Sequence, residues 1–246
     1  MSNEPTTNES SAGPAALARL QDRLGYTFEQ PALLQLALTH KSFAKQNNER
    51  LEFLGDAVLG YLIAEMLYRH NQQVREDGLS LMRASVVRGS VLAQVARGLD
   101  LGPSLRLGSG ERKSGGRNRD SILADAMEAI LGAMHEDGGI EPCRKVVTDL
   151  FAERIAQLDP DQLKDGKTRL QEHLQALRIG LPDYVVEDVG GAEHKRHYTV
   201  SCSVPELELR SEAQGTSRRG AEQAAAATML ELLDDKIAQE RVPGDE

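Results

Sequence analysis

The chain has 246 residues, in which 38 Asp and Glu outnumber 29 Lys and Arg and give a formal net charge of −9. This length suits one large domain or two smaller ones, and the charge argues against a globally basic nucleic-acid-binding protein while leaving room for a local basic patch. Two distant cysteines, Cys143 and Cys202, exclude a disulfide framework and a cysteine zinc site. With no signal peptide and no apolar run near about 20 residues, these features predict a cytoplasmic protein without membrane spans.

The first part of the chain is expected to be all-α. Residues 1–13 are polar and predict a disordered tail. Apolar residues then recur with a helical period over 14–158, and no stretch alternates as a strand would. Gly25 should end the first helix, and Pro31 should begin the second. The expected helices cover about 15–24, a segment from Pro31, and 48–70, 79–99, 119–137 and 141–158.

The second part has the pattern of a small α+β domain. Residues 159–166 are polar with Pro and Gly and predict a linker, 167–236 form the domain, and 237–246 form a tail. The expected elements are a helix at 168–177, strands at 184–189, 197–204 and 206–213, and an Ala-rich helix at 217–233. This α-β-β-β-α order predicts that both helices cover one face of an antiparallel sheet.

Five carboxylates gather on two of the expected helices. At about 100° per residue, Glu49, Glu52 and Asp56 fall within an arc of about 60°. Asp125 and Glu128 are i, i+3 neighbours on a later helix. Apolar side chains occupy the opposite side of each helix. For any single acid the simplest interpretation is a solvated face, because amphipathic helices normally carry their acids outside.

Two observations favour a metal site over two solvated faces. No Lys or Arg lies one turn along the acidic arcs, so i, i+4 pairing does not neutralise these acids. Gly60 and Gly132 come next on the acidic faces, and the cost of about 1 kcal/mol for a helical glycine makes sense if another helix approaches there. Two acidic faces brought together would repel unless a divalent cation lay between them. Oxygen ligands favour Mg²⁺ or Mn²⁺, which suit phosphate-ester chemistry.

Several long strings of the sequence resemble the ribonuclease III family. They are NERLEFLGDAVL at 48–59, LGYTF at 24–28, LTHKS at 38–42 and LGSGERKSGGRNRDSILADAMEA at 107–129. The resemblance implies an endonuclease domain that cuts double-stranded RNA, a double-stranded-RNA-binding domain after it, and a homodimer. It also implies Mg²⁺ in each active site, with Mn²⁺ as a substitute. Staggered cuts with short 3′ overhangs and ribosomal, messenger and transfer RNA precursors as substrates follow from the same resemblance.

The resemblance also assigns roles to individual acids. By position, Glu52, Asp125 and Glu128 match the Mg²⁺ ligands of the family. Asp56 matches its catalytic aspartate, so Asp56 and Glu128 are the expected catalytic pair. Glu49 and Glu76 match further acids of the catalytic groove, with a weaker string around Glu76. His40, His70 and His135 are expected to be surface or helix-end residues and not general bases.

Two further features of this part have both structural and functional interpretations. Phe53 projects about 40° from Glu49, beside the acids and away from the apolar stripe. It could pack under a loop, or it could enter a pocket on a second subunit, and the dimer of the family favours the second. The segment 108–119 carries Arg112, Lys113, Arg117 and Arg119. It could be a mobile surface loop, or its cations could meet RNA phosphates beside the groove.

The second domain carries nine Lys and Arg against twelve Asp and Glu over 167–236, so its bulk charge does not predict RNA binding. The positions of particular residues do. Ser217, Arg218 and Arg219 begin the last helix, where the helix dipole favours phosphate. Together with Gln171 and Glu172 on the first helix and His194 and Lys195 in the first strand turn, they resemble the three contact regions of a double-stranded-RNA-binding domain, which implies that these residues contact RNA. Gly220 stands where the family often has Lys, which should weaken phosphate binding.

Three activities are compatible with these patterns. The first is a Mg²⁺-dependent endoribonuclease acting on double-stranded RNA. The second is a non-catalytic double-stranded-RNA-binding protein. The loss of Asp56 or Glu128 would have indicated this alternative, but both residues are present. The third is a nucleotide phosphohydrolase on a helical scaffold, which the second domain disfavours. Cleavage of a plain RNA duplex with Mg²⁺ and with EDTA separates the three.

Overall fold

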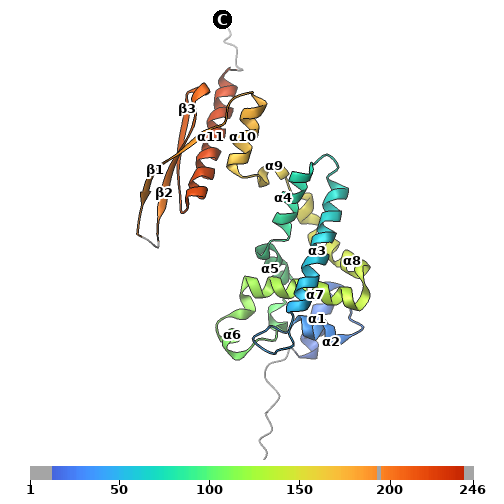
Figure 1. The fold of residues 1–246 in the computed structure, drawn as a ribbon. Coiled ribbons are helices and arrows are strands. Elements are labelled where there is room, and N and C mark those ends of the chain that lie inside the picture. The colour runs from blue at the N-terminus through green and yellow to red at the C-terminus, as the bar shows by residue number, and fades with distance from the viewer. Residues whose placement is uncertain (1–12, 193–194, 241–246) are drawn as a thin grey trace, which may run out of the picture. The chain divides into compact units, whose positions relative to one another are not determined.

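The chain divides by its internal contacts into two units, Met1–Pro160 and Asp161–Glu246. The computed structural model describes residues 13–192 and 195–240. The first unit is helical and the second combines two helices with a three-stranded sheet, as expected (Figure 1). No helix in the described part of the chain is long and apolar enough to cross a membrane.

The first unit is built around one buried helix, α7 (Asp120–Gly138). Four helices contact α7: α2 (Pro31–Ala37), α3 (Glu49–His70), α5 (Gly89–Gly98) and α8 (Ile140–Ala156) (Figure 1). The other helices of this unit are α1 (Pro14–Leu24), α4 (Glu76–Val86) and α6 (Ser109–Lys113), with 3-10 turns at Gly102–Ser104 and Gly116–Asn118. The short helix α9 (Pro160–Leu163) lies at the boundary between the two units. Small and aliphatic side chains surround α7, which explains why a chain with few aromatic residues still has a continuous core.

Helix ends follow local chemistry where the sequence signals them. Gly25 ends α1 in the left-handed conformation, with φ of 66°, and its N–H bonds back to the carbonyl of Asp22. Pro31 is the first residue of α2. Asn48 precedes α3, which runs to His70. These boundaries confirm the expected helices at 15–24, from Pro31 and at 48–70.

One expectation about the first unit is wrong, and two other segments contain more regular structure than expected. The single helix expected at 79–99 is two helices, α4 and α5, because Arg88 is extended with ψ of 139°. The break lets α4 pack on α3 and α5 pack on α7, which one straight helix could not do. The segment 108–119 is not a plain loop, since it contains α6 and a 3-10 turn. The expected linker at 159–166 contains α9.

Helices α3 and α7 approach closely through two glycines, one of which the sequence analysis missed. A Cβ on Gly55 would overlap the carbonyl oxygen of Glu128, and a Cβ on Gly132 would overlap that of Leu51. Gly132 therefore marks the approach as expected. Gly60 does not, because nothing lies within 4 Å of its Cβ position. The contact point on α3 is one turn and a half earlier than the pattern of acids indicated.

The second unit has the expected α-β-β-β-α order. Its elements are α10 (Gly166–Ala176), β1 (Asp183–Gly190), β2 (His197–Val204), β3 (Leu209–Gly215) and α11 (Arg218–Glu240). The antiparallel sheet has the order β1-β2-β3. The core holds Leu170 and Leu174 of α10, Cys202 and Val204 of β2, and the apolar face of α11. The third strand begins later than the expected 206, because Pro205–Leu207 form a 3-10 turn and Glu208 has a positive φ of 55°.

Candidate metal centre and nucleic-acid interface

Three partly buried carboxylates meet where α3 crosses α7. Glu52, Asp125 and Glu128 each offer one oxygen, and these oxygens all lie within 4.8 Å of one another. Their spacing on each helix is set by the helical period, but their meeting depends on the glycine contact between α3 and α7. Oxygen donors at this separation match the hard ligands that Mg²⁺ and Mn²⁺ take in proteins. The three residues therefore fit a divalent cation.

The electrostatics of the three acids show that the protein alone does not neutralise them. The pKa of Glu128 is raised to about 7, mainly by burial and then by the charges of Asp56, Asp125 and Glu52. Burial is also the largest cause of the raised pKa values of Glu52 and Asp125. A group of acids that resists ionisation is one that a cation would stabilise.

The other three expected acids occupy different surroundings. Asp56 is exposed on α3, and its charge contributes to the raised pKa values of Glu128 and Glu52, so it borders the group. Glu49 is exposed and pairs with Lys41 at 3.3 Å between Nζ and Oε1. The hydrogen bond from Asn47 and the pair with Lys41 lower the pKa of Glu49. Glu76 is the first residue of α4, accepts a hydrogen bond from Ser80, and lies outside the group of three.

Two basic residues, His40 and Lys41, lie beside the acids and were not among the expected site residues. The charge of His40 lowers the pKa of Asp125, and that of Lys41 lowers the pKa values of Asp125 and Glu52, although burial outweighs both. His40 is half-buried and lies beside Asp125, and the expectation that it is not a general base stays a prediction. The string LTHKS at 38–42 contained the signal, but helical periodicity gives no weight to residues between helices.

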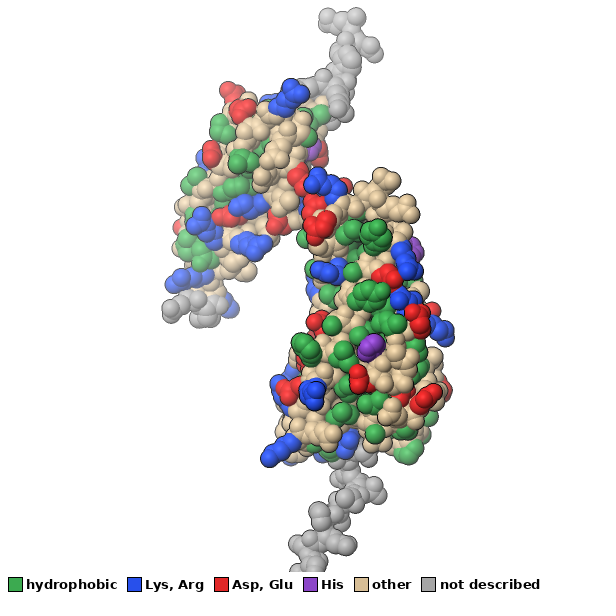
Figure 2. Space-filling model, turned by 45° about the vertical axis from the view of Figure 1, so that its right-hand side comes forward, with side chains coloured by type: hydrophobic (Ala, Val, Ile, Leu, Met, Phe, Trp, Pro, Cys, Tyr) green, Lys and Arg blue, Asp and Glu red, His purple; other side chains and the backbone are tan. Residues whose placement is uncertain are grey.

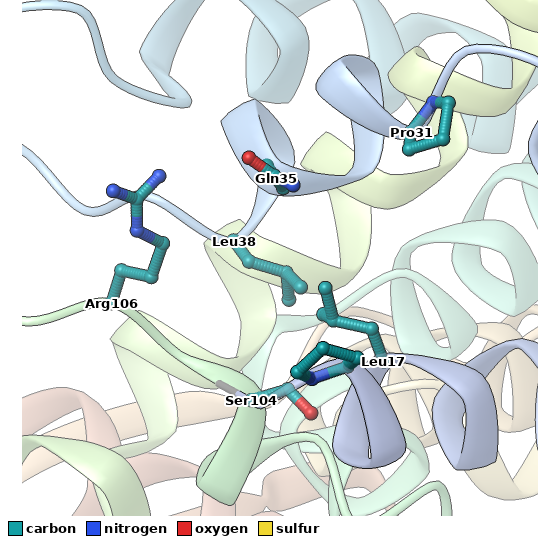
Figure 3. Close-up of a pocket in the computed structure, with 7 residues that line it drawn as sticks. Leu17, Pro31, Gln35, Leu38, Ser104 and Arg106 are labelled. Carbon is teal, nitrogen blue, oxygen red and sulfur yellow. The ribbon is translucent and has the colours of Figure 1, made fainter. Parts of the chain in front are cut away.

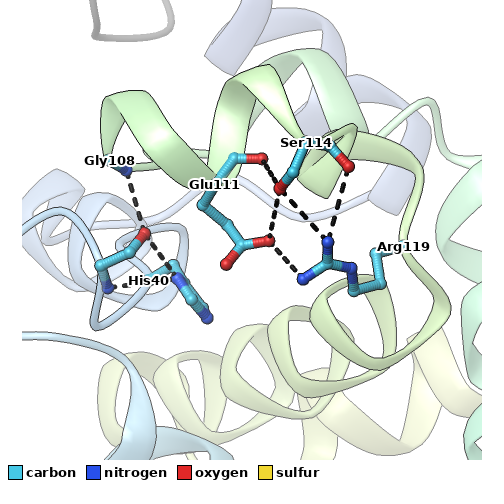
Figure 4. Close-up of polar contacts among 6 residues, drawn as sticks. His40, Gly108, Glu111, Ser114 and Arg119 are labelled. Atoms are coloured by element: carbon cyan, nitrogen blue, oxygen red, sulfur yellow. Dashed lines mark hydrogen bonds and ion pairs between the residues drawn. The ribbon is translucent and has the colours of Figure 1, made fainter.

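The segment that carries His40 and Lys41 is hydrogen-bonded to the segment before α7 (Figure 4). The Oγ of Ser42 accepts a hydrogen bond from the N–H of Gly108 at 3.0 Å and lies 2.8 Å from Nδ1 of His40. Beyond Gly108, the carboxylate of Glu111 forms an ion pair with Arg119, which also donates to Ser114. Arg119 is therefore held by protein groups although it is exposed, as Lys113 also is. The segment 108–119 is braced and not a free loop.

Aromatic side chains on α3 form an exposed apolar face. Phe53 is 81% exposed, and Tyr61 and Tyr68 are 53% and 74% exposed on the same side of the helix. Phe53 borders an open groove of about 940 Å³ with Leu33 and Leu36 of α2. Hydrophobic side chains gather along one face of the first unit in Figure 2. Such exposure rules out a core role for Phe53 within the single chain and leaves a face that a monomer would not favour.

A separate apolar pocket of about 440 Å³ lies near the start of α1 (Figure 3). Its lining includes Leu17, Leu38 and Arg106 and none of the expected acids. The guanidinium of Arg106 donates to the Oγ1 of Thr39 at 3.2 Å and stacks over the ring of Phe43. The arginine thus has a structural use, and the pocket adds no chemistry to the acidic group.

The expected RNA contacts of the second unit have different surroundings. Gln171, Arg218 and Arg219 line one open hollow of about 690 Å³ where α10 and α11 begin. Ser217 accepts a hydrogen bond from the N–H of Gly220 at 3.1 Å and caps α11. Lys195 is exposed between β1 and β2. His194 lies outside the described residues. Glu172 pairs with Lys164 at 2.7 Å and does not line the hollow.

Known proteins match both units. A family model described as "Ribonuclease-III-like" matches residues 30–155, and one described as "Double-stranded RNA binding motif" matches 167–233. The chain is 50% identical over 224 residues to Ribonuclease 3 of Alkalilimnicola ehrlichii, which covers 91% of this chain and 98% of that protein. It is 52% identical over 220 residues to Ribonuclease 3 of Hahella chejuensis, covering 89% of this chain and 97% of that protein. Among solved structures, the nuclease domain of ribonuclease III from Campylobacter jejuni is 41% identical to this chain, with a TM-score of 0.55. The match covers 56% of this chain and 96% of that one, and that structure is described for flexibility in a region involved in dimer formation.

Proposed function

Since the chain belongs to the ribonuclease III family and is an endoribonuclease of double-stranded RNA, we propose an active site for this reaction. It consists of Glu52, Asp56, Asp125 and Glu128. One observation carries the proposal. Three carboxylates from two helices bring oxygens within 4.8 Å of one another, and burial opposes the ionisation of each. Grouping partly buried acids lowers the stability of the fold, and a purely structural role would not explain why the protein keeps such a group.

The metal that this group would hold is Mg²⁺, with Mn²⁺ as a substitute. Glu52, Asp125 and Glu128 supply only oxygen donors, which these two ions accept and which zinc sites seldom use alone. A divalent ion bound there would supply charge neutralisation for the phosphodiester and a lowered pKa for the attacking water. Cysteine does not enter this chemistry, since Cys143 is buried in the core.

Asp56 would act from the exposed edge of the group. It lies one turn after Glu52 on α3 and is accessible to solvent, so its carboxylate can accept a hydrogen bond from the attacking water. Glu49 and Glu76 would line the catalytic groove farther from the metal than Asp56. The pair between Glu49 and Lys41 keeps one cation at the groove edge, where it reduces repulsion between the acids and the RNA backbone.

The exposed aromatic face of α3 would bind a second copy of the chain. Phe53, Tyr61 and Tyr68 are more exposed than large apolar residues normally are in a monomer. Burying Phe53 in a partner would contribute about 1.5–3 kcal/mol. Two subunits joined there would bring two acidic sites to one duplex. Each site would cut one strand, which leaves 5′-phosphate and 3′-hydroxyl ends with short 3′ overhangs.

The second unit would hold the duplex through its backbone. Gln171 and Lys195 would reach minor grooves, and Ser217, Arg218 and Arg219 would meet phosphates across the intervening major groove. Glu172 and His194 stay in this proposal as secondary contacts. Because phosphates carry no sequence information, the natural substrates would be chosen by duplex shape. Ribosomal RNA precursors in the cytoplasm, with some messenger and transfer RNA precursors, are the proposed substrates.

One assay tests the proposed active site. A plain RNA duplex is incubated with the protein in Mg²⁺, in Mn²⁺ and in EDTA, and the product ends are mapped. We expect cleavage in both metals, none in EDTA, and recessed 5′-phosphate ends. Binding without cleavage in every metal would favour the alternative of a non-catalytic double-stranded-RNA-binding protein.

A further inference from the structure

One carboxylate in the second unit joins the first turns of two helices. The Oε2 of Glu222 accepts a hydrogen bond from Nζ of Lys167 at 2.7 Å, and its Oε1 accepts one from Nε of Arg218 at 2.9 Å. Lys167 is the second residue of α10, and Arg218 is the first of α11. The side chain of Glu222 is only 12% exposed. Two cations that are 51 positions apart in the chain are therefore held by a single acid.

The surroundings of Lys167 fix its position further. Its ammonium lies 4.2 Å from the centre of the Tyr184 ring, which adds a cation–π contact. The helices touch at this point, because a Cβ on Gly166 would lie 2.5 Å from the carbonyl oxygen of Gln223. Because ordering a lysine side chain costs conformational entropy, the restraint of Lys167 indicates a specific role for its position.

The restrained cations still face an open hollow. Lys167, Arg218 and Arg219 all line it, as do Asp165 and Glu222. The side chain of Lys167 is 37% exposed and that of Arg218 is 67% exposed. An ammonium has three N–H donors and a guanidinium has five, so each cation keeps donors after it has bonded to Glu222. Three cations against two carboxylates leave the hollow with an excess of positive charge.

We propose that Glu222 is a positioning residue for RNA binding, which holds Lys167 beside Arg218 so that both cations meet the RNA phosphates. Lys167 thereby becomes a phosphate contact. The inference rests on the proposed role of Arg218 and Arg219 and extends it to the neighbouring helix. Holding long side chains in place before binding reduces the conformational entropy lost when the phosphate arrives. Gly220 adds no charge to the start of α11, whereas Lys167 adds one from α10.

A different account of Glu222 makes the opposite prediction. If Glu222 only stabilised α11 through an i, i+4 pair, or simply repelled phosphate, removing its charge would leave RNA binding unchanged or tighter. Under the positioning role, Glu222→Gln weakens binding although the protein becomes more positive. A glutamine can accept from one cation, but its amide NH₂ cannot accept from the other.

The experiment measures the affinity of the full chain for an RNA duplex in EDTA, at several salt concentrations. We expect Glu222→Gln to weaken binding about three- to tenfold and to lower the slope of log affinity against log salt by about one, the value for one lost phosphate contact. Glu231→Gln, on the exposed side of the same helix, is the matched control and should not weaken binding. Affinity equal to or tighter than that of the natural chain, with an unchanged slope, would overturn the proposal.

Variants of Lys167 separate positioning from folding. Lys167→Met should reduce affinity and slope, and Lys167→Arg should restore much of both. Lys236→Met is the control, because Lys236 donates to the carbonyl of Leu207 away from the hollow. In the Lys167→Met background, Glu222→Gln should cost less than it does alone, and additive losses would contradict a shared role. This double-mutant cycle tests whether Lys167 and Glu222 act together in RNA binding, even if Glu222→Gln lowers the midpoint of unfolding. If Arg218→Ala with Arg219→Ala leaves binding intact, the RNA-binding role itself fails.

Discussion

Gly55 of α3 lies directly against the carbonyl oxygen of Glu128 on α7, with no room between them for a methyl group. This contact sets the distance between the two helices at the level of the acidic group. It brings Glu52 of one helix within reach of Asp125 and Glu128 of the other. The side chain that is missing at position 55 is therefore as necessary to the group as the three carboxylates are.

Gly55→Ala tests that relationship. The added methyl group must push α3 away from α7, and overpacking of this kind costs about 1–3 kcal/mol. We expect a lower free energy of unfolding in denaturant, together with at least a tenfold loss of duplex cleavage. Gly98→Ala is the control, because Gly98 is also helical but has nothing within 4 Å of its Cβ position. Similar effects of the two substitutions would show that the helix contact is not special.

Glu128→Gln and Asp56→Asn test the chemical role of the acids. Both remove charge at the acidic group and leave the second unit untouched, so cleavage in Mg²⁺ should be lost while duplex affinity stays nearly constant. Turnover and binding are measured on the same duplex, with binding in EDTA. Retention of turnover within tenfold of the natural chain by both variants would refute the assignment of the metal site.

The raised pKa of Glu128 predicts a pH-dependent stability. Burial and neighbouring acids move this pKa from 4.5 to about 7. Between these two pH values the folded state binds more protons than the unfolded state, so the stability that this group contributes is lost as pH rises through about 7. In metal-free protein, Glu128→Gln should therefore raise the unfolding temperature at pH 8, and the gain should shrink towards pH 5. Mg²⁺ should bind more weakly below about pH 7, because it must displace the proton. A gain that grows at low pH would have the wrong sign.

Arg218 and Arg219 should act through phosphates without reading bases. Each is paired in the free protein, Arg218 with Glu222 at 2.9 Å and Arg219 with Asp165 at 3.8 Å, so the contacts are modest in strength. Joint replacement by Ala should weaken binding to duplexes of any sequence to a similar extent and flatten the salt dependence. Affinity lost for one sequence alone would contradict the phosphate role.

Phe53→Ala should weaken a dimer without unfolding the subunit. The side chain is 81% exposed in the single chain, so its removal leaves no cavity in the core. Sedimentation at low micromolar concentration should show more monomer, while helical circular dichroism is preserved. Tyr68→Ala, 15 positions along the same face, should act in the same direction. A variant that remains fully dimeric would place the interface elsewhere.

Much of this protein could be predicted from its sequence because the signals are local. Helical periodicity places Glu49, Glu52 and Asp56 on one face, and it places Asp125 and Glu128 on another. Gly25 and Pro31 mark helix ends through backbone conformations that few other residues adopt. Alternating apolar residues and turns predict the three strands of the second unit. These features depend only on residues a few positions apart.

Relationships between distant segments required the tertiary structure. The approach of α3 to α7 uses Gly55 and not Gly60, because the crossing point depends on how both helices pack on the core. The break at Arg88 lets α4 and α5 pack on different helices, which the helical period of 79–99 did not indicate. The raised pKa of Glu128 and the pairing of Lys167 with Arg218 through Glu222 likewise depend on burial and on charges brought from elsewhere in the chain. Periodicity sets which side of a helix a residue occupies, but only packing decides what that side meets.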